Sequence, residues 1–171
     1  ALNSYHDVRI AVITDEGAWS RWMWMRWLPH VFANEDRRLR MVVSKPNAVH
    51  DVLSYLDEVL MMRGDLISPD DDPEEARPLP HYVVFVTDPA FLDNQPLMRH
   101  LLDRPLGMPV VLLAPSMEFL PKECRIIIDA AKNPGSLYTA EGDVTPVAFE
   151  TADVPKLRAF AHELAPIRVK D

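Results

Sequence analysis

The chemistry that this sequence offers lies at the end of one apolar run, residues 81–88 (HYVVFVTD). A buried strand that ends in an acid is the Walker B arrangement, in which the carboxylate holds Mg²⁺ through water beside a nucleotide. Asp88 is therefore a candidate nucleotide-site residue. Aspartate also favours turns, so a structural role for Asp88 is the alternative. Pro89 follows and can neither accept a proton nor polarise water, so even a vestigial site here is not expected to hydrolyse nucleotide.

The phosphate-binding half of such a site is missing from the sequence. A P-loop requires G-x-x-x-x-G-K-[ST], whose backbone amides cradle the phosphates. None of the five glycines is followed by lysine. Gly-x-Gly is also absent, which excludes the dinucleotide fingerprint. We expect no catalytic residue and no cofactor in this segment.

Metal-ligating and nucleophilic residues are scattered along the chain. The six histidines form no ligand spacing with Cys124. His162 and Glu163 begin an H-E-x-x-H pattern, but Pro166 stands where the second histidine is required. The aspartates at 70–72 lack the glycine and distal glutamate of a calcium loop, so a solvated acidic loop is the better interpretation. We expect no metal site.

All four tryptophans lie within nine positions of residues 19–30 (WSRWMWMRWLPH). On an α-helix, Trp19, Met23 and Trp27 share one face, which is enough to pin the helix to a sheet. Pro29 is expected to end this helix, because the residue before a proline avoids the α region.

The remaining two tryptophans do not fit on that face together. Helix geometry places Trp22 about 60° and Trp24 about 140° from Trp19, so at least one large aromatic is expected on the surface. Exposed Trp and Arg are enriched at interface hot spots. Trp22, Trp24 and Arg26 are therefore a candidate docking face, with simple core packing as the alternative.

Composition limits the class of protein. The 171 residues suit a single domain over 1–171, and 48% of them are hydrophobic. The formal net charge of -8 disfavours direct nucleic-acid binding. One cysteine excludes an intramolecular disulfide. No apolar run approaches the ~18 residues of a membrane span, so no direct membrane insertion is expected. A strand-like run close to the first residue suggests a fragment of a longer protein.

Strands alternate with helices along the chain, which predicts an α/β fold with a mainly parallel sheet flanked by helices. Strands are expected at 8–14, 38–44, 81–88, 108–114 and 125–129, the last three fully buried, with an antiparallel pair at 135–140 and 144–150. Helices are expected at 45–64, 95–103 and 154–165. The break at 65–80, with six carboxylates and four prolines, is predicted to be an acidic surface loop.

The longest helix has the clearest pattern. Pro46 fits its first turn, and Gly64 is expected to follow its end. Six apolar residues repeat at helical spacing and are predicted to face the core: Val49, Val52, Leu53, Leu56, Val59 and Leu60.

Five stretches occur in a distinctive order: SYHDVRIAVITDE, WMWMRWLPHV, LPHYVVFVTDP, LGMPVVLLAPSMEFLPKEC and ELAPIRV. With them, nearly the whole chain resembles the segment between the membrane helices and the first motor domain of the FtsK/SpoIIIE-type ATPases of type VII secretion, the EssC/EccC family. The resemblance implies a P-loop-NTPase-like but degenerate fold. It also implies a bacterial, membrane-anchored, hexamer-like parent at the cytoplasmic face of the cell membrane, whose motor domains use ATP and magnesium.

The same resemblance assigns places to individual residues. Asp88 takes the Walker B position, with Pro89 in place of the catalytic glutamate. Residues 114–116 (APS) take the end of the strand that senses the γ-phosphate and offer no glutamine or arginine for that task. The P-loop strand and its helix would precede Ala1, and residues 165–171 would begin a linker to the next domain.

The resulting hypothesis is a non-catalytic domain that couples the membrane anchor of a type VII secretion ATPase to its motors and docks other domains and subunits of the secretion complex. One alternative is a nucleotide-binding ATPase domain that uses Asp88. The other is part of an FtsK-like DNA translocase, which the net charge disfavours.

Overall fold

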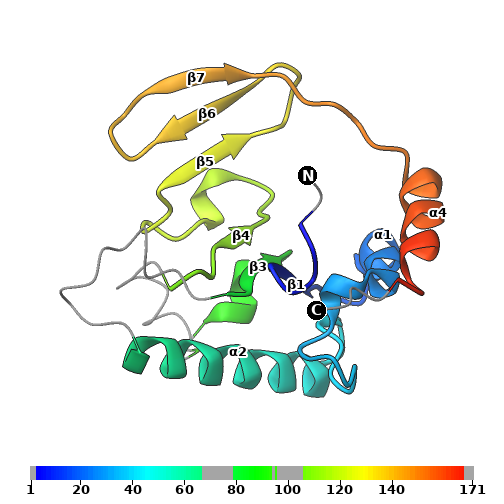
Figure 1. Cartoon of the computed structure of the whole chain (residues 1–171). Helices are drawn as coiled ribbons and strands as arrows, with labels where there is room; N and C mark the ends of the chain where they lie inside the picture. Colours follow the sequence, from blue (N-terminus) through cyan, green and yellow to red (C-terminus); the bar gives the residue numbers. More distant parts are fainter. Residues whose placement is uncertain (1–2, 67–78, 94, 96–105, 168–171) are drawn as a thin grey trace.

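The structure is a computed structural model that describes residues 3–66, 79–93, 95 and 106–167 (Figure 1). Most of the predicted acidic loop at 65–80, nearly all of the predicted helix at 95–103 and the end of the predicted linker at 165–171 lie outside the described residues.

A four-stranded parallel sheet forms the centre of the fold, in the order β2-β1-β3-β4. Its strands are β1 (Val8–Ile13), β2 (Val42–Val43), β3 (His81–Val86) and β4 (Val110–Leu112). The two longest, β1 and β3, pair over their full length from Val8↔His81 to Ile13↔Val86. Each lies within a strand expected from its β-branched and aromatic residues, so the predicted parallel α/β architecture is confirmed.

Helix α2 (Pro46–Leu66) covers one face of this sheet (Figure 1). All six residues of the predicted inward stripe are buried, and they pack with Ala11, Ile13, Val84 and Val86 in one core cluster. The predicted end of the helix is wrong, because Gly64 lies inside the last turn. Arg63 explains the extension: its buried side chain bonds to backbone carbonyls beyond the helix and holds the last turn in place.

The opposite face carries shorter elements. These are α1 (Trp19–Trp22), two 3-10 turns, η1 (Met23–Trp27) and η2 (Pro29–Val31), and the C-terminal helix α4 (Val154–Leu164). A second core cluster joins them to the sheet: Val12, Met25, Leu28, Val31, Phe32, Val42 and Ala161. In Figure 1, α4 stands beside α1 at one side of the molecule.

A second sheet is antiparallel and has the order β5-β6-β7. It consists of β5 (Ile126–Asp129), β6 (Gly135–Thr139) and β7 (Val144–Val147), and lies apart from the parallel sheet in Figure 1. The predicted pair β6–β7 is confirmed, but β5 joins it and is not a buried strand of the main sheet. Ile126 is 62% exposed.

Strands β3 and β4 also differ from the expectation of full burial. On β3 one face is buried, while His81, Val83 and Phe85 on the other are half-buried. The residues of β4 are half-buried or exposed, because β4 is the last strand of the described sheet and only one neighbouring strand shields it. The short 3-10 turns η3 (Pro89–Leu92) and η4 (Met117–Phe119) follow β3 and β4.

None of the helices within the described residues combines the length and the apolar character that a bilayer crossing demands.

Candidate functional site

The carboxyl edge of the parallel sheet is the place where open α/β sheets bind ligands. The two central strands end there side by side. The hydroxyl of Thr87, just after β3, donates to the hydroxyl of Thr14, just after β1, over 3.0 Å. Thr14 is completely buried. This bond fixes the two strand ends, so that Asp15 and Asp88 follow on adjacent strands.

Both aspartates are bonded to the backbone that follows them. Asp88 Oδ1 accepts a hydrogen bond from the Ala90 N–H at 3.0 Å, and Asp88 is the N-cap of η3. Asp15 Oδ1 accepts one from the Ala18 N–H at 2.8 Å, just before α1. A side-chain oxygen that satisfies a free N–H at the start of a helical turn has a structural role by itself.

The remaining groups at this edge do not form a phosphate cradle. Pro89 occupies the first position of η3 and contributes no N–H. After β4, the hydroxyl of Ser116 donates to Glu118 Oε1 at 3.0 Å, so it is bonded to a side chain two residues further along. Among the described residues no three metal-ligating side chains gather into a possible metal site. Asp88 thus follows a strand of the parallel sheet, as the sequence predicts, and its carboxylate bonds to the backbone of the next turn.

The tryptophan segment folds differently from the predicted α-helix. It is α-helical only from Trp19 to Trp22 and continues as the 3-10 turn η1. A 3-10 turn advances about 120° per residue, so the predicted common face of Trp19, Met23 and Trp27 is lost. Met25 becomes the buried residue, and Trp27 is 39% exposed. The predicted end at Pro29 is wrong for the α-helix, which ends at Trp22. Leu28, the residue before Pro29, does have the extended conformation expected there, with ψ 137°.

The three residues of the candidate docking face lie on or near the second core cluster. Trp22 and Trp24 are half-buried and pack against it, and the Trp22 ring centroid lies 5.9 Å from that of Phe85. Arg26 is half-buried, with its guanidinium carbon 5.4 Å from the centroid of the Trp27 ring. The aromatic that the sequence requires on the surface is therefore Trp27.

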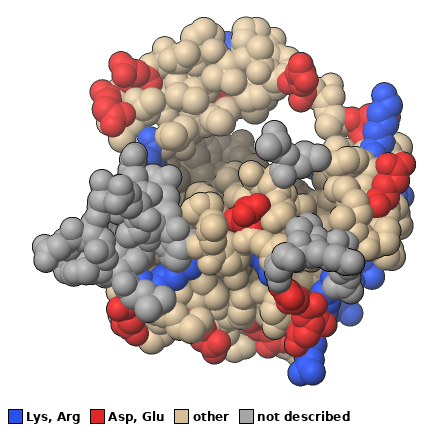
Figure 2. Space-filling view, in the orientation of Figure 1, with Lys and Arg blue, Asp and Glu red and all other residues tan. Residues whose placement is uncertain are grey.

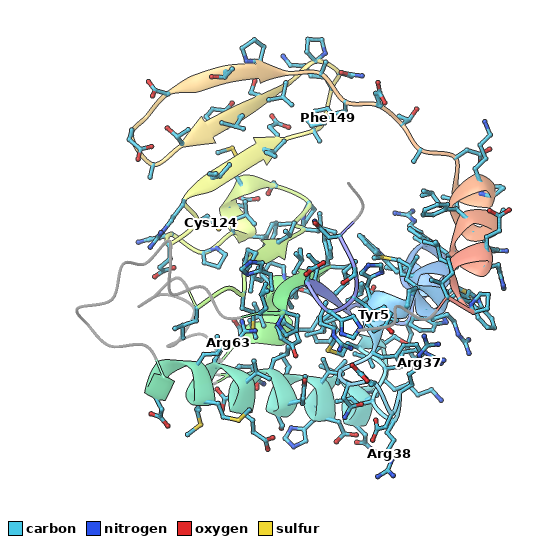
Figure 3. All side chains as sticks on the ribbon, in the orientation of Figure 1. Tyr5, Arg37, Arg38, Arg63, Cys124 and Phe149 are labelled. Atoms are coloured by element: carbon cyan, nitrogen blue, oxygen red, sulfur yellow. The ribbon has the colours of Figure 1, made fainter. Side chains whose placement is uncertain are left out.

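Trp27 connects this face to α4. Its ring centroid lies 4.5 Å from that of His162. Beside this contact, α4 has an open apolar depression of about 410 Å³ whose lining includes Pro155, Arg158 and His162. From the loop before β2, Arg37 donates to the carbonyl oxygens of Ala165 and Ile167 at 3.3 and 3.4 Å, beyond the helix end (Figure 3). Such bonds satisfy carbonyls that a helix terminus leaves free.

Positive charge accumulates near the tryptophans. Arg40 places its guanidinium carbon 5.0 Å from the centroid of the Phe32 ring. Burial, and secondarily the positive charge of Arg26, lower the pKa of Arg40. Two arginines that repel each other beside exposed aromatic surface favour an acidic or carbonyl-rich contact.

The residue that the sequence analysis missed is Arg63. Its side chain is buried and donates to the carbonyl oxygens of Leu106 at 2.7 Å, Gly107 at 3.2 Å and Pro80, with Tyr82 stacked against it (Figure 3). Desolvation lowers its pKa. The signal was present, because Arg63 continues the helical stripe of Leu56 and Leu60 at the next inward position.

Cys124 is half-buried and is a free thiol (Figure 3). Burial, and then the charge of Glu123, raise its pKa, so the reactive thiolate is disfavoured.

No protein-family profile matches the chain. Two curated proteins are similar to it: the ESX secretion system protein EccC of Geobacillus thermodenitrificans, 26% identical over 129 residues, and the ESX secretion system protein YukB of Bacillus subtilis, 28% identical over 139 residues. Each match covers 74% of this chain and only 8% of the relative.

Two solved structures share the fold. EssC ATPases 2 and 3 from Geobacillus thermodenitrificans align with a TM-score of 0.57 and 10% identity, over 95% of this chain and 39% of that one. Thermomonospora curvata EccC ATPases 2 and 3, in complex with a signal sequence peptide, align with a TM-score of 0.61 and 15% identity, over 96% and 37%. The expected resemblance to EssC/EccC proteins and the P-loop-ATPase-like fold are confirmed.

Proposed function

We propose that this chain, similar to ESX secretion proteins of the EccC type, is a non-catalytic docking domain of a membrane-anchored type VII secretion ATPase. It lies at the cytoplasmic face of the cell membrane, between the anchor and the motor domains of an oligomeric, hexamer-like parent. There it connects these parts and contacts other domains and subunits of the secretion complex. ATP and magnesium belong to the motor domains of the parent.

The observation that carries this proposal is the use of Asp88 as an N-cap. A Walker B carboxylate has to face the metal and its water, with a catalytic glutamate beside it. Here the carboxylate bonds to the Ala90 N–H, and Pro89 stands in the place of the glutamate. A fold that keeps its core but lacks phosphate-handling groups retains its surface as the functional part.

The docking surface that we propose comprises Trp22, Trp24, Arg26 and the exposed Trp27. Aromatic and arginine side chains lie together on it, which is the composition of interface hot spots. The nearby charges of Arg26 and Arg40 favour a partner that brings carboxylates or free carbonyl groups to this surface.

The first experiment tests for nucleotide binding. Isothermal calorimetry and thermal shift with Mg-ATP on the purified chain are expected to give neither heat nor stabilisation, for the wild type and for Asp88→Ala. Magnesium-dependent binding that disappears in Asp88→Ala would replace this proposal with the ATPase alternative. DNA binding, seen as a shifted band in a gel-shift assay at moderate salt, would favour the translocase alternative.

The second experiment tests docking in the full-length secretion ATPase. Trp27→Ala and Arg26→Glu change exposed or half-exposed groups and are expected to weaken recovery of the assembled complex, with Met62→Ala, an exposed apolar residue of α2, as the matched control. Trp22→Ala and Trp24→Ala are scored beside a thermal melt, because both side chains also support the core. Unchanged assembly of the secretion complex in all four variants would contradict the docking role.

A further inference from the structure

Negative charge is concentrated in one stretch of this sequence. The formal net charge is -8, and residues 67–78 (ISPDDDPEEARP) contribute five carboxylates against one arginine. This stretch begins where α2 ends at Leu66. It is followed by Leu79 and by Pro80, whose carbonyl accepts a hydrogen bond from Arg63 in the last turn of α2. The acidic stretch therefore leaves the described structure and rejoins it at one place, the C-terminal end of α2.

Positive charge is concentrated around the exposed ring of Trp27. Arg26 lies over this ring, and Arg40 is close enough to be affected by the charge of Arg26. Arg158 lines the apolar depression on α4 together with His162, which stacks on Trp27. Figure 2 shows lysine and arginine side chains projecting at this side of the molecule, among scattered carboxylates.

The carboxylates that would neutralise this surface are missing from the described part of the chain. The ion pairs there join Arg38 to Asp36 and His6 to Glu35, and none involves the three arginines around Trp27. Among the described residues, the buried Nε–H of Arg40 also has no hydrogen-bond acceptor. Guanidinium groups beside aromatic rings are well suited to bind carboxylates brought by another segment.

The acidic stretch is too short to reach this surface within its own chain. Helix α2 has 21 residues and is therefore about 30 Å long. Its first turn lies at the side of the molecule that carries α1 and α4, and its last turn lies at the opposite side (Figure 1). Twelve residues with both ends at that last turn extend from it by at most about 20 Å, half of their contour length. A second copy of the chain has to supply the acidic stretch.

We propose that residues 67–78 of one copy of the chain bind the surface formed by Trp27, Arg26, Arg40 and Arg158 of a second copy. Carboxylates of the stretch pair with the guanidinium groups, and its prolines pack on the aromatic ring and limit the entropy lost on binding. The contact is head-to-tail, because the two surfaces lie at opposite sides of one molecule, which distinguishes it from a two-fold dimer. This inference rests on the docking surface of the proposed function and names its partner.

The test is sedimentation of the purified 171-residue chain over a series of protein concentrations. Wild type is expected to associate. The association is expected to weaken about tenfold or more from about 0.1 M to about 1 M salt, since the Debye length falls from about 10 Å to about 3 Å. A chain that stays monomeric at every concentration in low salt would overturn the proposal. That result would leave docking to other subunits of the secretion complex standing, so the two ideas can fail separately.

Two variants, each defective on one side of the contact, identify the two surfaces. The first keeps the acidic stretch and reverses two charges of the surface, with Arg26→Glu and Arg158→Glu. The second keeps the surface and neutralises the stretch, with the substitutions Asp70→Asn, Asp71→Asn, Asp72→Asn, Glu74→Gln and Glu75→Gln. Each variant alone is expected to associate about tenfold or more weakly than wild type. An equimolar mixture is expected to form dimers of one copy of each variant that grow no further, and a mixture that stays monomeric would overturn the head-to-tail contact.

Matched controls separate this pairing from an effect of net charge. Lys122→Glu with Lys132→Glu changes the net charge as much as the surface variant does, at exposed positions away from Trp27. This control is expected to associate like wild type, and an equal loss in it would overturn the proposal. Because Arg26 is half-buried, Arg158→Glu alone, at an exposed position, is measured with a thermal melt and is expected to weaken association without lowering the melting temperature. Association that survives neutralisation of the stretch but not the surface variant would assign the surface to another occupant and overturn the proposal.

Discussion

The carboxylate of Asp88 and the backbone N–H of Ala90 are joined by a 3.0 Å hydrogen bond, so the acid that ends the central strand is committed to the turn that follows it. This bond gives the Asp88 carboxylate a structural role, which stability measurements test separately from nucleotide binding.

Replacement of Asp88 by alanine is expected to lower the free energy of unfolding by about 1 kcal/mol, because the Ala90 N–H loses its cap. Asp88→Asn keeps a side-chain oxygen and is expected to remain within about 0.5 kcal/mol of wild type. Urea denaturation followed by circular dichroism measures both variants. An Asp88→Ala protein as stable as wild type would contradict the capping role.

The four tryptophans are expected to separate into two classes. Trp22→Ala removes a half-buried ring from the second core cluster, and we expect a loss of about 2 kcal/mol, below the 3–5 typical of a fully buried aromatic. Trp27→Ala removes an exposed ring whose partners are His162 and Arg26, and we expect less than about 1 kcal/mol. Thermal unfolding measures both. The reverse order of effects would mean that Trp27, and not Trp22, supports the core.

Arg63 is expected to be among the most sensitive positions of the fold. Arg63→Met fills similar space but leaves the buried carbonyl of Leu106 and the partly buried carbonyls of Gly107 and Pro80 without their donor, so we expect a loss of about 3 kcal/mol. Arg63→Lys is expected to recover only part of this, since one ammonium does not reproduce the guanidinium fork. Full recovery by lysine in urea titrations would indicate that charge alone matters at this site.

Tyr82 gives a prediction for alkaline pH. Burial first, and then its hydrogen bond with Tyr55 over 2.8 Å, raise the pKa of the Tyr82 phenol above the ordinary value of 10.0. The folded protein therefore keeps this proton when the unfolded chain has lost it. Stability from this group is complete below about pH 10 and falls as pH rises beyond it, because the unfolded state then binds fewer protons.

Denaturation midpoints, measured over about three pH units from pH 8 to pH 11, report this fall in stability. Tyr82→Phe keeps the ring that stacks on Arg63 and removes the titrating group. Its stability curve is expected to be flatter than that of wild type over the same range. An equally steep curve in Tyr82→Phe would place the alkaline effect on another group.

The sequence predicts those elements whose hydrophobic pattern directly reflects which of their residues are buried. The inward stripe of α2 and the apolar strands β1 and β3 have clear sequence patterns, so these elements could be placed without coordinates. The pairing of β1 with β3 comes from the structure alone. The same reasoning fails for the tryptophan segment, because periodicity presupposes an α-helix and the chain turns to a 3-10 conformation after Trp22.

Strand β5 shows a second limit of prediction from the sequence. Its apolar run is as continuous as that of a central strand, yet Ile126 and Ile128 are exposed in an antiparallel sheet. Apolarity predicts that a surface will be covered but not by which element. At the candidate site, the sequence places Asp88 at a strand end correctly. It does not indicate that the Asp88 carboxylate bonds to Ala90, since a two-residue backbone contact leaves no pattern.

Two glycines, Gly135 in the antiparallel sheet and Gly64 in α2, provide a matched pair of substitutions. An added Cβ at Gly135 would collide with the carbonyl oxygen of Asp129 and lie 2.6 Å from the Phe149 ring. Phe149 cannot move away easily, because its backbone N–H and C=O both bond to the Asn133 amide, at 3.1 and 2.8 Å. Gly135→Ala is therefore expected to destabilise by about 2 kcal/mol or more, through overpacking.

Gly64, near the end of α2, has nothing within 4 Å of an added Cβ. Gly64→Ala is expected to stabilise by about 0.5–1 kcal/mol, because alanine loses less backbone freedom in a helix. Urea titration of both variants gives opposite signs if this packing is correct. A neutral Gly135→Ala would mean that β5, β6 and the Phe149 segment do not pack as closely as described. A destabilising Gly64→Ala would mean that a further segment packs against the end of α2.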